Sequence, residues 1–159
     1  MVQPSDKTTN YIVWDKKFEL GIPMIDAQHK KIVDMCNELY QVLAHTNRED
    51  EKAWQNAMRK TLQEAAKYVN EHFRSEEGLL KAACYKNFDG HKCKHTEFIK
   101  EILNKIENFN TLTYNDAFKF VKFLYDWLLT HIAYVDKDYV PTVKAYALKR
   151  EQENGAYHS

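Results

Sequence analysis

The stretch IDAQHKKIVDMCNELYQVL, residues 25–43, carries an apolar stripe with the period of an α-helix. Apolar residues recur at every third or fourth position, which places them on one face of a helix. A histidine stands on the same stripe, so the stretch predicts an amphipathic helix that turns an imidazole towards the protein core. The stripe consists of Ile25, His29, Ile32, Cys36, Leu39 and Leu43.

Three more stretches repeat this pattern along the chain. The second covers residues 50–80, with Asn47 as the expected N-cap before it. The third follows the loop YKNFDG, residues 85–90, and the fourth follows Thr113, which is expected to cap it because Asp116 stands three positions later. Four amphipathic helices with short links predict an all-α fold, an up-down-up-down four-helix bundle.

The chain is expected to form one domain, residues 1–159, because this length is enough for a single core. The bundle core is predicted over residues 23–136. Residues 1–22 are predicted to form an N-terminal extended arm that packs against the bundle through its apolar and aromatic side chains. Residues 137–159 form a short C-terminal extension, with a helix expected from about residue 141 to residue 153.

Composition and charge exclude several classes of protein. The 23 basic and 23 acidic residues balance, which argues against a nucleic-acid-binding protein that relies on a positive field. No apolar run approaches the ~20 residues of a membrane span, and the N-terminus lacks the pattern of a secretory signal. The odd number of cysteines, Cys36, Cys84 and Cys93, predicts a reduced, cytoplasmic protein.

Five of the seven histidines lie on the apolar stripes of the four predicted helices. A single core histidine is usually a neutral imidazole with a hydrogen-bond partner. Five of them would need separate partners, and each unsatisfied group would cost about 1–3 kcal/mol. One metal centre would satisfy them together, so the pattern favours a metal site over a plain helical bundle. The five are His29, His72, His91, His95 and His131.

Helical spacing pairs several of these residues. Positions four apart on a helix point within about 40° of each other, so His72 shares a face with Glu76, and His91 shares one with His95. These are spacings at which one helix gives two ligands to one metal site.

The fourth helix offers His131 and then Asp136, five positions later. Five positions correspond to about 140° around an ideal helix, which is poor geometry for two ligands of one site. We therefore expect the helix to be widened, as in a π-bulge, or overwound or loosened at this point.

Five imidazoles and two carboxylates are too many donors for a structural zinc ion, which takes four ligands. Calcium and magnesium sites consist mostly of oxygen, whereas imidazole with carboxylate suits iron, manganese or zinc. Seven donors suit two metal ions that share carboxylates. Glu76 and Asp136 are the candidate bridges, and Glu77 falls off the stripe and is predicted to be solvated.

Four segments of the chain, in this order, resemble the hemerythrin family, and its bacterial single-domain members in particular. The resemblance runs from about Trp14 to Asp136, most of the chain. Each segment alone is a weak signal, but the full ordered set is specific. The segments are WDKKFELGIPMIDAQH (14–29), HFRSEE (72–77), HKCKH (91–95) and WLLTHIAYVD (127–136).

The resemblance implies a non-haem di-iron centre, two iron ions with an oxo or hydroxo bridge, inside the bundle. It assigns each matching residue a role towards the metal ions. One iron would be held by His91, His95 and His131, the other by His29 and His72 with one position open, and Glu76 and Asp136 would bridge the pair.

The implied function is reversible binding of dioxygen, for carriage, storage or delivery in the cytoplasm, and not catalysis. Trp127 and Leu128 would line the oxygen pocket. Di-iron oxygenases use carboxylate-rich ligand sets with two Glu-x-x-His motifs, which the stripes of this sequence lack. Two alternatives would use the same centre: an oxygen or redox sensor module, and an enzyme that reduces peroxide or nitric oxide.

Overall fold

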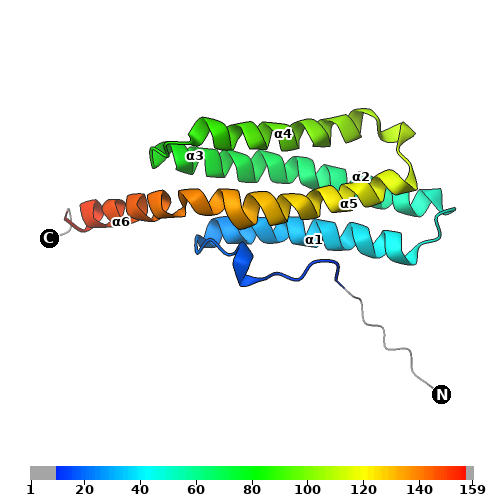
Figure 1. The fold of residues 1–159 in the computed structure, drawn as a ribbon, viewed down its shortest axis with the longest axis horizontal. Helices are drawn as coiled ribbons and strands as arrows, with labels where there is room; N and C mark the ends of the chain where they lie inside the picture. Colours follow the sequence, from blue (N-terminus) through cyan, green and yellow to red (C-terminus); the bar gives the residue numbers. More distant parts are fainter. Residues whose placement is uncertain (1–9, 157–159) are drawn as a thin grey trace, which may run out of the picture.

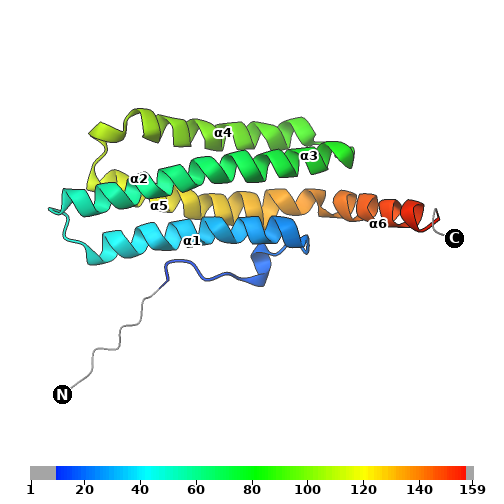
Figure 2. The same ribbon diagram turned by 180° about the vertical axis from the view of Figure 1, so that it is seen from behind.

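The computed structural model of the protein describes residues 10–156, which form a bundle of four helical rods. Neighbouring rods run in opposite directions and are joined by short links (Figure 1). The same arrangement is seen from the opposite side in Figure 2. The predicted all-α, up-down-up-down bundle is therefore confirmed.

The first two rods come from the N-terminal half of the chain. The first is the helix α1, Pro23–His45, which begins with a proline at its first position, where the missing N–H costs no hydrogen bond. The second begins as α2, Glu51–Tyr68, and widens into a π-helical segment η2, Val69–Phe73. It then continues as α3, Arg74–Ala82, along the same axis (Figure 2).

The other two rods complete the bundle. The third is α4, Phe88–Glu107, and the fourth begins as α5, Tyr114–Trp127. Beyond α5 the fourth rod passes through a second π-helical segment η4, Leu128–Val135, and a 3₁₀ turn η5, Asp136–Tyr139. It ends as α6, Val140–Ala156, which extends past the other helices at that end (Figures 1 and 2).

The links between the rods differ in two details from the sequence predictions. The N-cap of α2 is Asp50, whose carboxylate accepts a hydrogen bond from the Ala53 N–H, so the prediction of Asn47 is wrong. The loop before α4 is shorter than expected, because the helix already begins at Phe88. A 3₁₀ turn η3, Phe109–Thr111, joins α4 to α5.

The arm packs against the bundle over its described residues, as predicted; residues 1–9 lie outside them. Ile12 and Phe18 are buried, the latter in the 3₁₀ turn η1, Lys16–Phe18. The Ile12 backbone exchanges two hydrogen bonds with the Asn37 side chain of α1, at 2.8 and 2.9 Å. The Asp26 carboxylate accepts the Leu20 N–H at 2.8 Å, which fixes the entry into α1.

The core consists of two apolar clusters, one on each side of a layer of buried polar side chains. On α1, Ile25 belongs to the smaller cluster and Ile32 to the larger one, and His29 lies between them in the sequence. The fourth rod has the same order in reverse, with Leu128 in the larger cluster and Tyr139 in the smaller. The polar layer is thus enclosed by apolar packing at both ends.

The C-terminal extension forms a helix, as predicted, although α6 is longer at both ends than the expected range and residues 157–159 lie outside the description. Its first turns pack on the smaller apolar cluster through Val143 and Val140. Within residues 10–156, no helix is both long and apolar enough to cross a membrane.

The predicted cap of the fourth helix is confirmed and yields a first test. The Thr113 hydroxyl accepts the Asp116 N–H at 3.2 Å, and the Asp116 carboxylate accepts the Thr113 N–H at 3.0 Å. Thr113→Ala should lower the free energy of unfolding by about 1 kcal/mol, as measured in urea. Thr96→Ala, which removes an exposed hydroxyl within α4, should leave it nearly unchanged.

The cap should also depend on pH. Hydrogen bonds from Thr113 lower the pKa of Asp116 below its ordinary value. A lowered pKa in the folded state stabilises the protein above the unfolded pKa of about 4, and this contribution is lost as the pH falls. Asp116→Asn should therefore cost stability at pH 7 and much less at pH 2; an equal loss at both pH values would contradict the assignment.

Candidate metal centre

Five imidazoles and two carboxylates meet in the polar layer between the two apolar clusters. All seven side chains are at most 2% exposed. The structure therefore brings together every residue that the sequence predicted as a metal ligand; ligation itself stays a prediction. They are His29 on α1, His72 and Glu76 on the second rod, His91 and His95 on α4, and His131 and Asp136 on the fourth rod.

The imidazoles present the same ring nitrogen, Nε2, to this cluster. The Nε2 atoms of His91 and His95 lie 3.1 and 3.0 Å from one oxygen of Glu76. Those of His131 and His29 lie 3.0 and 3.3 Å from the two oxygens of Asp136. The fifth belongs to His72, whose Nε2 is 3.2 Å from that of His29.

The donor atoms form two groups that share a carboxylate. One group holds three histidines with Glu76, and the other holds His29 and His72 with the same Glu76; the donor atoms of each group lie within 4.8 Å of one another. Asp136 also faces both groups, with one oxygen near His131 and the other near His29. Both carboxylates therefore lie where a bridge between two metal ions would need them.

Several of these atoms are close together without forming hydrogen bonds. Both oxygens of Asp136 and the Nε2 atoms of His95 and His131 have no hydrogen bond of normal geometry within the described residues. Buried polar atoms without partners are rare, because each one costs free energy. Lone pairs that face a common point are what ligands of a cation present, so the donor set fits a metal centre of imidazole and carboxylate.

The electrostatics of the layer favour the ligand form of three of these groups. At His91, the hydrogen bond with Glu76 instead raises the pKa, despite burial. Burial lowers the pKa of His72 to about 3, which keeps its imidazole neutral with a free lone pair. Burial also lowers the pKa of His131. Burial alone would raise the pKa of Glu76, but the hydrogen bond with His91 and the nearby imidazoles of His95 and His72 hold it well below its ordinary value. Glu76 is therefore a carboxylate.

The π-helical segment η4 explains how His131 and Asp136 reach the same site. In a regular α-helix, residues five apart diverge by about 140°. The wider turn of η4, which ends just before Asp136, brings both side chains to one side, with their nearest atoms 3.0 Å apart. The predicted local widening is confirmed. A second π-helical segment, η2, contains His72 and was not foreseen from the sequence.

Two of the imidazoles are held in orientation by partners on their outer nitrogen, Nδ1. The Nδ1 atom of His72 is 2.8 Å from the side-chain oxygen of Gln28, and that of His95 is 3.1 Å from Glu77. The prediction that Glu77 is solvated is therefore wrong, since its side chain is only 20% exposed. Such partners fix a ligand ring and raise its basicity.

Tyr139 also touches the site and was not predicted. Its hydroxyl donates a hydrogen bond to the Glu76 oxygen that does not face His91 and His95. The tyrosine lies three residues after Asp136 in the 3₁₀ turn η5, and residues three apart share a face in such a turn. The three-residue spacing between Asp136 and Tyr139 would have indicated this contact only if the 3₁₀ turn had been predicted from the sequence.

Aromatic rings cover the three-histidine side of the layer. Trp127 stacks on His131 with ring centroids 3.9 Å apart, and Phe73 stacks on His95 at 3.8 Å. Leu128 is completely buried in the larger cluster, one turn before His131. The residues expected to line an oxygen pocket are thus close to the site, although that role stays a prediction.

Comparisons with known proteins agree with this geometry. The family described as "Hemerythrin HHE cation binding domain" matches residues 20–143. A bacteriohemerythrin of Clostridium acetobutylicum is 32% identical over 133 residues, which cover 80% of this chain and 98% of that protein. A bacteriohemerythrin of Stenotrophomonas maltophilia is 30% identical over 149 residues, which cover 92% of this chain and 92% of that protein. A solved structure of wild-type hemerythrin, 28% identical, superposes with a TM-score of 0.66 over 84% of this chain and 98% of that one.

The contact between Glu77 and His95 yields a test of the site. Glu77→Ala should weaken metal binding about 10–100-fold, because it frees the His95 ring to turn. The affinity can be measured by competition with a chelator. Glu97→Ala is the matched control. It removes the same charge as Glu77→Ala, and Glu97 is exposed on the same helix as His95. Equal losses in the two variants would show that charge, and not ring orientation, is responsible.

Proposed function

Because the chain belongs to the hemerythrin family, we propose that it binds dioxygen reversibly at a non-haem di-iron centre. The observation that carries this proposal is the uneven division of the buried donors. Three imidazoles gather on one side of the shared carboxylates and two on the other. Two metal ions held there would differ by one ligand, which leaves a position for an external molecule.

The roles of the individual residues follow from the two groups. His91, His95 and His131 would hold one iron, and His29 and His72 would hold the other. Glu76 and Asp136 would bridge the pair, because each carboxylate faces both groups. A pair of iron ions held in this way would supply the electrons for binding dioxygen, each ion changing between the ferrous and ferric states.

The ligand set supports binding and release of oxygen over its chemical consumption. Five neutral imidazoles and two carboxylates form a less anionic shell than the four glutamates and two histidines of di-iron carboxylate proteins. A less anionic shell gives less support to highly oxidised metal ions. The ligand set therefore favours return of the oxygen molecule intact.

The chain's own residues would protect the bound oxygen from water. Phe73, Trp127 and Leu128 surround the layer with apolar surface, and the first two lie flat against ligand rings. A dry pocket supplies few protons, and proton supply is what allows reduced oxygen to leave irreversibly. The free cysteines, Cys36, Cys84 and Cys93, support a place in the reducing cytoplasm.

A sensor role is the second candidate, and the Tyr139 contact favours it. Tyr139 bonds to the bridging candidate Glu76 and stands directly before α6, which extends beyond the bundle. A change in the charge or position of Glu76 would therefore reach α6 through one hydrogen bond. Oxygen binding and a sensory response are compatible, because the same centre would serve both.

The proposal predicts both the metal content and an optical response. Purified protein should contain about two irons per chain, the number that seven imidazole and carboxylate donors suit. Exposure of the reduced protein to oxygen should produce a new visible absorption band, and removal of oxygen should restore the original spectrum. An anaerobic-to-oxygen optical titration measures this directly.

The controls separate the parts of the proposal. Asp136→Ala should abolish the paired-iron spectrum, whereas Asp138→Ala, an exposed carboxylate two residues away, should leave it unchanged. One iron per chain, or zinc alone, would contradict the di-iron centre. An oxygen response that never reverses would instead favour the alternative of an enzyme that reduces peroxide or nitric oxide.

A further inference from the structure

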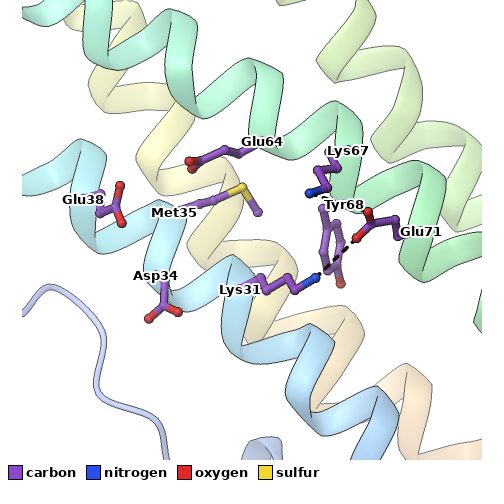
Figure 3. Close-up of a pocket in the computed structure, with 8 residues that line it drawn as sticks. All are labelled: Lys31, Asp34, Met35, Glu38, Glu64, Lys67, Tyr68 and Glu71. Carbon is purple, nitrogen blue, oxygen red and sulfur yellow. Dashed lines mark hydrogen bonds and ion pairs between the residues drawn. The ribbon is translucent and has the colours of Figure 1, made fainter.

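A groove on the surface between α1 and the second rod leads towards the two-histidine side of the centre. It has a volume of about 250 Å³, several times the roughly 30 Å³ that one water molecule occupies in the liquid. Figure 3 shows Met35 from α1 and Tyr68 from α2 between the helices. Both side chains line the groove although they are only 4% and 2% exposed, so they form its floor.

Tyr68 is also a wall of the metal site. Its ring stacks on that of His72, with centroids 4.7 Å apart and an angle of 28° between the planes. One aromatic ring therefore separates the groove from a residue of the two-histidine group. The Tyr68 hydroxyl is buried without a hydrogen bond of normal geometry in the described part of the chain. The ring also meets Phe73 edge-to-face, with centroids 5.8 Å apart, and its hydroxyl lies near the Trp127 side chain. Turning the ring aside would therefore break ring contacts but no hydrogen bond of normal geometry.

A second groove, of about 330 Å³, approaches the centre from the opposite side. It is lined by Trp127, Phe123 and Glu97 among others, and it reaches His131. His131 belongs to the three-histidine group, whose metal ion would have the fuller ligand set. The first groove, in contrast, leads to the two-histidine side, where a position for an external molecule would remain.

The charges of the first groove favour the entry of uncharged ligands over that of anions. Two lysines and four carboxylates line it, a net charge of −2, which Lys60 at its edge reduces to −1 through ion pairs with Glu38 and Glu64. Lys31 of α1 and Glu71 of η2 form an ion pair of 3.3 Å across the groove, beside Tyr68 (Figure 3). An acidic mouth repels anions and leaves uncharged molecules unaffected.

We propose that this groove is the route by which small neutral molecules such as dioxygen reach the centre, and that Tyr68 is its gate. The inference rests on the proposed function, because it assumes an open metal position beside His29 and His72. Entry requires the Tyr68 ring to move away from His72. The Met35 side chain, unbranched and flexible, lines the floor beside it and can adapt to this motion.

The gate is tested by the rate at which ligands bind to the iron-loaded protein. Tyr68→Ala should speed the association of dioxygen with the reduced protein about tenfold, a barrier change that stopped-flow absorption resolves easily. Tyr68→Phe, which keeps the ring, should leave the rate near that of the natural protein. Phe123→Ala is the matched control in the second groove and should also leave it unchanged.

A charge variant tests the route without changing a core residue. Glu64→Gln removes one negative charge from the first groove, and Glu97→Gln removes one from the second. Association of azide with the oxidised protein at low ionic strength should become about twofold faster in Glu64→Gln only, which is the effect of one charge about 10 Å away through water. Dioxygen, being uncharged, should respond to neither.

A third measurement does not depend on the iron chemistry. Crystals under xenon pressure should show xenon, a neutral probe, between Met35 and Tyr68.

The rate measurements can overturn the proposal in two ways. Faster ligand association in Phe123→Ala and Glu97→Gln, in place of the first-groove variants, would overturn the route. Equal association rates in all variants would overturn the gate. Protein that binds iron but responds to neither dioxygen nor azide would overturn the proposed function, and the gate with it.

Discussion

The structure depends on burying seven ligand-type side chains in one layer of an otherwise apolar core. Each imidazole or carboxylate buried without a partner costs free energy, and several atoms of this layer have no hydrogen bond within residues 10–156. The cost is reduced only if the donors share a common partner at their centre. All four rods must therefore keep a fixed axial position relative to one another, because each contributes at least one donor. The apolar clusters on either side supply the packing that holds them there.

The same constraint explains where the helices depart from regular geometry. The two π-helical segments, η2 and η4, occur on the two rods that carry the carboxylates, and each contains a histidine of the layer. A π turn costs hydrogen-bond quality but rotates the residues that follow it. On the fourth rod this rotation brings Asp136 back to His131. The 3₁₀ turn after it then turns Tyr139 towards Glu76, so one irregular stretch places three functional side chains.

Periodicity in the sequence was sufficient to predict the bundle and six of the seven donors of the layer, because polar ligands stand out on an otherwise apolar stripe. Asp136 lies off the regular spacing of its helix, and its prediction depended on an expected local distortion that η4 supplies. The neighbours of the donors were harder to find. Glu77 follows Glu76 and lies off the stripe, yet it reaches His95 on another rod. Gln28 resembles any polar residue of a helix until the distance to His72 is known. Such contacts depend on how two rods face each other, and a periodic pattern on one rod contains no information about that.

The two sides of the centre differ in a way that suits a protein whose ligand must enter and leave. On the three-histidine side, Phe73 and Trp127 lie flat on the imidazoles, and Glu77 holds His95 from outside. That side is fixed by many contacts. On the two-histidine side, His72 is held by Gln28 but is covered by Tyr68, whose hydroxyl is not anchored by a well-formed hydrogen bond. The three-histidine side would thus keep the metal positions constant. On the other side the single Tyr68 ring stands between His72 and the groove, so its movement would change access without disturbing the ligand set.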